Sequence, residues 1–288
     1  VERGSELSPL IEALAAGEVF GPETFAAYYD LVEAILAEDE AGAGRWIDHL
    51  VKARPAPAGI AKYFHGNPAD AWFIDILGTR LDLETTSFHP TDADRAAAFF
   101  ERFDQGRALI AAHLPDLGGE LDAILRAIAI GNGTPPDGAR REFTFDGGSI
   151  YSMWGFLFLN AERHQTPLAM AEVLAHEAGH SFLFGFTIDD QLALNDEAER
   201  YASPLRDDPR PMEGIYHATF VSARMCYTMK AFAEAASLDS AIRDEARKAM
   251  DRDRRNFHMG HAVVAEHGRL SEPGEALMAG AKAWMDTL

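Results

Sequence analysis

Two histidines and a glutamate form the pattern in this chain that is best suited to chemistry. They lie in the segment His176-Glu177-Ala178-Gly179-His180. On an α-helix, residues four apart lie on one face about one turn apart, so both imidazoles can reach one metal ion. Glu177 points in an adjacent direction, within reach of a metal-bound water. We therefore predict a metal centre, in preference to two solvated histidines on a surface helix.

The helix that carries this pattern has recognisable ends. Thr166 is a suitable N-cap residue and Pro167 suits the first helical turn. Gly185 is a typical residue at the end of a helix. These residues predict one helix that begins near Pro167 and ends near Gly185.

Glu199 is one candidate for the third metal ligand. Eighteen residues separate it from His180 (199 − 180 − 1), a spacing similar to that of one group of zinc peptidases, with Glu197 as a nearby competitor. In that interpretation zinc polarises a carbonyl group and Glu177 deprotonates the bound water. However, residues 197–201 look like an acidic helix segment, and such charges more often form a solvated face.

His217 is the other candidate. A proline-rich loop ends at Pro211, and a helix is predicted to begin near Met212. His217 and Arg224 are seven residues apart on that helix, separated by roughly 10 Å along one stripe. An arginine grips a carboxylate with two hydrogen bonds, so a metal at His217 would have a guanidinium about one small dicarboxylate away. For Arg224 taken alone, a salt bridge on the helix surface is the simpler interpretation.

The stretch from about 168 to 225 resembles the HExxH-motif peptide-modification family, the 2-oxoglutarate-dependent peptide β-hydroxylases of ribosomal-peptide biosynthesis. The order and spacing of several short pieces carry the resemblance, which covers about a fifth of the chain. The pieces are Leu174-Ala-His-Glu-Ala-Gly-His180, Ser203-Pro-Leu-Arg-Asp-Asp-Pro-Arg-Pro211, Gly214-Ile-Tyr-His217 and Arg224.

The resemblance implies an iron(II) oxygenase in which His176, His180 and His217 hold the iron. Arg224, helped by Arg210, would anchor the distal carboxylate of the cofactor 2-oxoglutarate. The substrate would be a ribosomally made precursor peptide, hydroxylated at the β-carbon of one residue. Imidazole and carboxylate ligands suit iron(II) and leave positions open for O₂.

Glu177 has a different role in the two mechanisms. It is the general base of a zinc peptidase, whereas in an oxygenase it orients a ligand or water. Glu213 is either an alternative ligand or an exposed residue at a helix start, where the macrodipole favours an acid. A peptide-binding module without turnover is a third, non-enzymatic possibility.

Composition narrows the classes of partner. The 288 residues carry 26 basic and 46 acidic side chains, a formal charge of 26 − 46 = −20, and 47% of them are apolar. So acidic a protein repels nucleic acid and anionic lipid, and no segment has the roughly 20 apolar residues that span a bilayer. Cys226 is the single cysteine, so no internal disulfide can form, which suits a reducing cytoplasm. Its side chain is expected to be buried. Oligomeric state is left open.

Helical periodicity predicts a mainly α fold with a minor β hairpin. Two further features interrupt the helices: residues 70–77 fit a short strand or a buried helical turn, and Asp-Gly-Gly at 146–148 within 141–151 indicates a hairpin turn. The run Arg54-Pro-Ala-Pro-Ala-Gly59 is the best boundary, between a helical subdomain at 1–60 and a metalloenzyme core at 61–288. Helices are predicted at 6–17, 22–40, 92–113, 119–130, 212–236, 239–267 and 273–287.

A second group of histidines lies near the C-terminus. His258, His261 and His267, with Glu266, fall in one predicted helix. We expect these side chains to be solvated or locally hydrogen-bonded.

Overall fold

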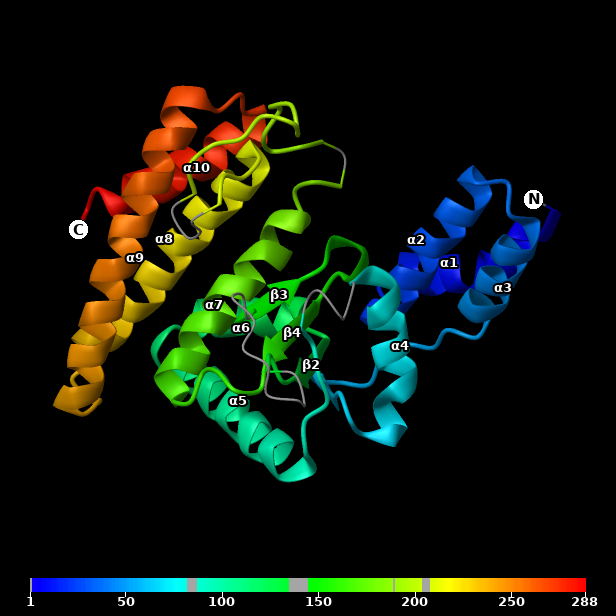
Figure 1. The fold of residues 1–288 in the computed structure, drawn as a ribbon, viewed down its shortest axis with the longest axis horizontal. Helices are drawn as coiled ribbons and strands as arrows, with labels where there is room; N and C mark the ends of the chain where they lie inside the picture. The colour runs from blue at the N-terminus through cyan, green and yellow to red at the C-terminus, as the bar shows by residue number, and fades with distance from the viewer. Residues whose placement is uncertain (1, 82–86, 135–144, 189, 204–207) are drawn as a thin grey trace. The chain divides into compact units, whose positions relative to one another are not determined.

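The computed structural model describes residues 2–81, 87–134, 145–188, 190–203 and 208–288. The described chain is mainly helical with one small four-stranded sheet (Figure 1), which confirms the predicted fold class. It forms two compact units: Val1–Ala98 with Asp122–Arg163, and Phe99–Leu121 with His164–Leu288. None of the described helices is long and apolar enough to cross a membrane.

The first unit begins with three helices, α1 (Ser8–Ala15), α2 (Pro22–Leu36) and α3 (Glu40–Val51). They share a small apolar core that contains Ala27, Leu31, Ala43, Ile47 and Leu50. Helix α2 also packs against α4 (Ala71–Arg80) and against the 3₁₀ turn Tyr151–Met153. The predicted division into a subdomain at 1–60 and a core at 61–288 stays a prediction. The two compact units divide the chain after Ala98, Leu121 and Arg163.

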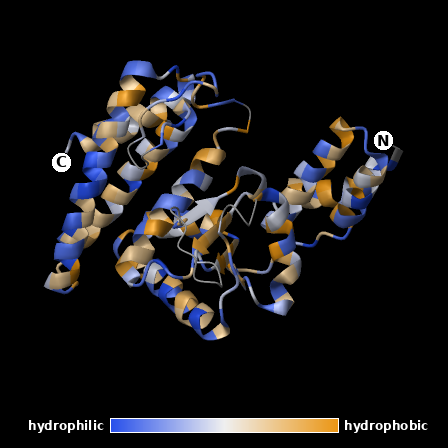
Figure 2. Ribbon diagram, in the orientation of Figure 1, coloured by the Kyte–Doolittle hydropathy of each residue, from blue (hydrophilic) through white to orange (hydrophobic). Residues whose placement is uncertain are grey.

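The sheet has the order β1-β2-β4-β3, formed by β1 (Ala61–Phe64), β2 (Ala127–Gly131), β4 (Phe156–Asn160) and β3 (Gly147–Ser149). Strands β1, β2 and β4 are parallel, and β3 pairs antiparallel with β4. Every residue of β2 and β4 is buried, and strands at the centre of the sheet are coloured as hydrophobic in Figure 2. The two central strands therefore lie in a core, whereas the edge strands β1 and β3 are only partly buried.

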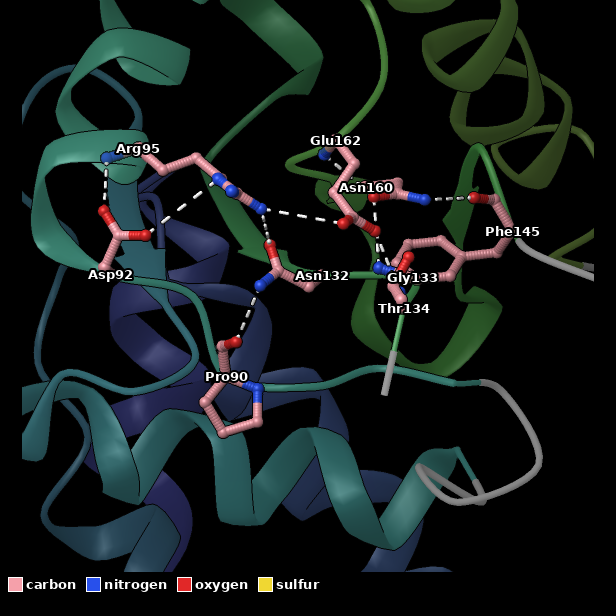
Figure 3. A network of polar contacts seen from close by, with 9 residues as sticks. All are labelled: Pro90, Asp92, Arg95, Asn132, Gly133, Thr134, Phe145, Asn160 and Glu162. Carbon is pink, nitrogen blue, oxygen red and sulfur yellow. Dashed lines mark hydrogen bonds and ion pairs between the residues drawn. The ribbon is translucent and has the colours of Figure 1, made fainter. Parts of the chain in front are cut away.

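Hydrogen bonds of polar side chains connect the ends of β2 and β4 (Figure 3). Buried Asn160 accepts hydrogen bonds from the backbone N–H of Gly133 (3.2 Å) and Glu162 (2.9 Å) and donates to the Phe145 carbonyl (2.9 Å). Arg95 donates to Asn132 Oδ1 at 3.2 Å and lies 3.6 Å from a carboxylate oxygen of Glu162. Ligands often bind at the carboxyl ends of parallel strands, but these groups satisfy one another, so we assign them a structural role.

Two β-region predictions are wrong. The helix expected at 119–130 is α6 (Pro115–Ile124) followed by β2. A strand buried on both faces is a continuous apolar run, and the period of such a run does not distinguish a strand from a helix.

The predicted hairpin does not turn at Asp-Gly-Gly. Gly147 and Gly148 lie in β3, and the chain turns through Tyr151–Met153 and Gly155, whose φ is +82°. A side chain at Gly148 would collide with the Phe158 ring, so this glycine permits close packing. Residues 141–144 lie outside the described residues.

Other elements agree with the sequence more closely. Residues 70–77 are helical, as most of α4, and α2 ends at Leu36, before the expected residue 40. Helix α5 spans Ala93–His113, close to the predicted 92–113. Three further predicted helices are confirmed as α8 (Met212–Glu234), α9 (Ser240–His267) and α10 (Glu272–Met285).

The second unit is built around α7 (Pro167–Phe184) and α8. Helix α8 packs along α9 and against α7, and the long pair α8–α9 is evident in Figure 1. Buried apolar side chains of α8, including Ile215, Tyr216 and Val221, share a core with Phe257 of α9 and Met278 of α10. This packing places one face of α8 beside the predicted metal-binding residues of α7.

Candidate metal centre

Helix α7 has the ends that its sequence predicts. The Thr166 side chain accepts a hydrogen bond from the Ala169 N–H (3.1 Å), Pro167 is the first helical residue, and Gly185 follows the last. The helix places His176, Glu177 and His180 within about one turn of one another.

These three side chains bring potential ligand atoms close together. The Nε2 atoms of His176 and His180 are 3.2 Å apart, and Glu177 Oε1 lies 3.8 Å from His176 Nε2. One ligand atom from each of the three fits within 4.8 Å. Two nitrogens bound to one ion at about 2.1 Å, at right angles or tetrahedrally, would be roughly 3.0–3.4 Å apart. The histidine pair therefore fits a first-row transition metal ion.

His217 reaches this group from α8. Its Nδ1 lies 3.0 Å from His180 Nδ1, and the two rings stack with centroids 5.3 Å apart. His217 is only 7% exposed, and its Nε2 has no hydrogen-bond partner among the described residues. His180 thus directs one ring nitrogen towards His176 and the other towards His217. The three predicted iron ligands are neighbours, but His217 faces the ring nitrogen of His180 opposite to the one that faces His176, and it lies outside the closest three-residue group. One ion held by all three histidines would require the ring of His180 or of His217 to turn.

Burial favours the neutral form of the His180 and His217 imidazoles. Burial lowers the pKa of His217 to about 4. Burial, followed by the effect of nearby His217, lowers the pKa of His180 well below its ordinary value. Neutral imidazole is the form that binds a metal, so protons would compete only weakly with a metal for these two candidate ligands near pH 7.

Glu199 is placed elsewhere. The acidic helix expected around 197–201 is wrong, because these residues lie in a non-helical connection between α7 and α8. The Glu199 carboxylate accepts hydrogen bonds from Asn195 (3.1 Å) and Tyr201 and forms an ion pair with Arg269 (3.3 Å). These partners lower its pKa, with the Tyr201 hydrogen bond contributing most. In this structure Glu199 stabilises the connection and is not part of the histidine group.

Arg224 lies beside α7, as its spacing from His217 suggests. Its Cδ lies against Gly179, where an added Cβ would be 3.0 Å away. Its guanidinium lies 5.2 Å from the Phe182 ring centroid and 5.9 Å from that of Phe220. Both terminal nitrogens donate to the Glu120 carboxylate. Arg224 therefore binds a carboxylate in this structure, and that carboxylate belongs to the chain itself.

Sequence reasoning missed Glu120, the partner of Arg224. It lies on α6, 104 residues away in sequence, and no local sequence pattern predicts a pairing over such a distance. The charge of Arg224 was the only available signal that a carboxylate should lie opposite.

The remaining predicted residues lie at the start of α8. Arg210 forms an ion pair with Asp208 (2.8 Å) and pairs through its backbone with Tyr201. Glu213 is exposed in the first turn of α8, as expected for a helix-start residue. Residues 204–207 of the matching proline-rich piece lie outside the described residues.

Residues outside this centre have local partners. Cys226 is buried, as predicted, and burial raises its pKa to about 12. The His267 ring stacks on Tyr201, and His261 lies against Phe257.

Comparisons with known proteins do not identify a family for this chain. No protein-family model matches the chain, and no curated protein matches its sequence significantly. The resemblance to peptide β-hydroxylases therefore stays a prediction.

Proposed function

We propose that this protein is an iron(II)- and 2-oxoglutarate-dependent oxygenase that hydroxylates the β-carbon of a residue in a ribosomally made precursor peptide. The observation that supports it is the different placement of the two third-ligand candidates. His217 contacts His180, whereas Glu199 is held by Tyr201, Asn195 and Arg269. The peptide class of the substrate rests on the resemblance alone.

The residues of α7 and α8 would have different roles in this reaction. His176 and His180 would hold the iron, joined by His217 once its ring or that of His180 has turned, and the iron would supply the redox chemistry when bound. Arg224 would hold the distal carboxylate of 2-oxoglutarate, and this carboxylate would have to displace that of Glu120. Glu177, buried beside His176, would orient a water or a ligand at the centre.

A zinc peptidase is the second candidate, and one observation favours it. Glu177 and the two motif histidines form the close three-residue group in the described chain. A carboxylate so near both imidazoles would suit a general base that acts on a metal-bound water. That mechanism needs a third protein ligand, and Glu199 would have to leave its present partners to supply it.

Spectroscopy on the metal-free protein separates the two mechanisms without a known substrate. Iron(II) and then 2-oxoglutarate are added under anaerobic conditions, and the weak visible charge-transfer band of a chelated keto acid is recorded. We expect the band in the wild type and in Glu199→Ala, and its loss in His217→Ala. Zinc affinity is measured for the same three proteins.

Each outcome bears on one mechanism. Absence of the band in the wild type, together with tight zinc binding that Glu199→Ala weakens, would replace the oxygenase by the peptidase. Glu177→Gln then provides a further check, because it should abolish hydrolysis of a peptide substrate while leaving metal binding in place.

A further inference from the structure

A pocket of about 320 Å³ lies on the second unit, between α6, α8 and α10. Its volume is at the lower end of ligand pockets, which suits a single side chain better than a large cofactor. The lining residues that matter here are Asp116, Glu120, Phe220, Arg224, Tyr227 and Trp284.

Aromatic rings form one side of the pocket. Tyr227 and Trp284 meet edge to face, with centroids 5.4 Å apart and an interplanar angle of 74°. Tyr227 is 40% exposed, so its surface is accessible from solvent. Aromatic faces attract cations through their quadrupole, and tryptophan does so most strongly. The apolar parts of the wall also suit the methylene stem of a long side chain.

The charges at the pocket favour a cation as well. Glu120 is neutralised by its two contacts with Arg224. Asp116 is exposed in the first turn of α6 and forms no ion pair with any residue that the structure describes. The pocket therefore retains one uncompensated negative charge, in a chain whose formal charge is −20.

We propose that this pocket binds a basic side chain, lysine or arginine, of the peptide substrate. The stem would lie among the apolar wall residues, with the charged end near Asp116 and the rings of Tyr227 and Trp284. That the occupant belongs to a substrate rests on the proposed function, whereas the preference for a cation rests on the pocket alone. In the protein without 2-oxoglutarate, an acidic side chain would meet Asp116 and would find Arg224 paired with Glu120.

Binding to the intact protein without metal or 2-oxoglutarate tests the pocket by itself. The probes are three blocked pentapeptides, Gly-Gly-X-Gly-Gly, in which X is lysine, norleucine or glutamate. Lysine and norleucine share a four-carbon stem and differ in the ammonium group. The readout is the indole N–H resonance of Trp284, identified by its loss in Trp284→Phe; the other tryptophans, Trp46, Trp72 and Trp154, serve as internal references.

We expect the lysine peptide to shift the Trp284 resonance and to bind about fivefold or more tightly than the norleucine peptide. Asp116→Asn should weaken lysine binding about threefold and leave norleucine binding unchanged. Asp251→Asn, which removes the same charge from an exposed position on α9, is the matched control and should change neither. The glutamate peptide should leave the resonance in place.

Equal binding of the lysine and norleucine peptides would overturn the proposal, as would an unmoved Trp284 resonance at millimolar lysine peptide. Because no iron is added in this experiment, a negative result would count against the cation site and would leave the proposed function untouched. Lysine binding here with no keto-acid band in the earlier experiment would support the cation site and refute the oxygenase.

Discussion

Burial sets the protonation of individual residues around α7, and it does so in opposite directions for bases and acids. Removing an ionised group from water disfavours its charged form. The pKa of His217 therefore falls to about 4 and that of Asp253 rises to about 8. Neutral histidines at neutral pH would suit the proposed metal site, whereas an ionised buried aspartate lowers the free energy of unfolding.

Asp253, on α9, is 1% exposed, with the carboxylate of Glu172 from α7 and the guanidinium of Arg252 nearby. Burial is the largest cause of its raised pKa, the charge of Glu172 adds to it, and Arg252 opposes both. Because the folded-state pKa lies above the unfolded value of about 3.9, the folded state binds more protons between about pH 4 and 8. The contribution of Asp253 to the free energy of unfolding is therefore most favourable below pH 4 and is lost as pH rises through about 8.

We predict that Asp253→Asn becomes progressively more stable than the wild type as pH rises from 5 to 8. The difference should grow by up to about 1.4 kcal/mol per pH unit, the limit for one proton. Urea unfolding at pH 5, 6.5 and 8 measures it, with exposed Asp251→Asn as the control. A difference that stays constant over this range would contradict the prediction.

At the scale of elements, the contact between α7 and α8 depends on the absence of a side chain at position 179. A Cβ on Gly179 would lie 2.9 Å from Val221 Cγ1 and 3.0 Å from Arg224 Cδ. Both atoms belong to α8, the helix that carries His217. The glycine of the motif thus allows α7 and α8, which carry the candidate metal ligands, to approach one another.

We predict that Gly179→Ala destabilises the protein by about 1–3 kcal/mol through overpacking and weakens metal binding by moving α8. Alanine at an unobstructed helical position has the opposite effect, because it is the better helix former by about 1 kcal/mol. Gly280, exposed on α10 with nothing within 4 Å of a built Cβ, supplies that comparison. Thermal unfolding and zinc titration of both variants measure the effects. A Gly179→Ala protein as stable as Gly280→Ala would show that α8 does not need this close approach.

For the whole molecule, charge is the dominant property. The formal charge of −20 and a pI near 4.8 imply substantial self-repulsion at neutral pH. Ion pairs offset part of it on the described surface, for example Lys230 with Glu234 and Lys282 with Asp286, but exposed pairs contribute little each.

We predict that raising NaCl from 20 to 200 mM at pH 8 increases the melting temperature by a few degrees, because salt screens this repulsion. Near pH 5 the net charge is close to zero, so the same addition should have little effect. Scanning calorimetry at both pH values measures the difference. A melting temperature that falls with salt at pH 8 would mean that attractive ion pairs outweigh the repulsion.

The sequence by itself determined features whose causes lie within a few residues. The cap at Thr166, the proline at 167 and Gly185 define α7, and the i, i+4 spacing places His176 beside His180. Apolar periodicity similarly predicts α8, α9 and α10 closely. Capping and helical spacing act within about one turn, so the sequence contains all that they need.

Only the tertiary structure decided the features that depend on partners far along the chain. Residues 127–131 form a strand because β1 and β4 pair with them on both sides, and Gly148 lies in a strand, packed against Phe158. Arg224 meets Glu120 across 104 residues, and Glu199 leaves the expected site because Tyr201 and Arg269 hold its carboxylate. Burial and pairing are properties of the packed whole, so local spacing supplies candidate ligands and folding selects which of them meet.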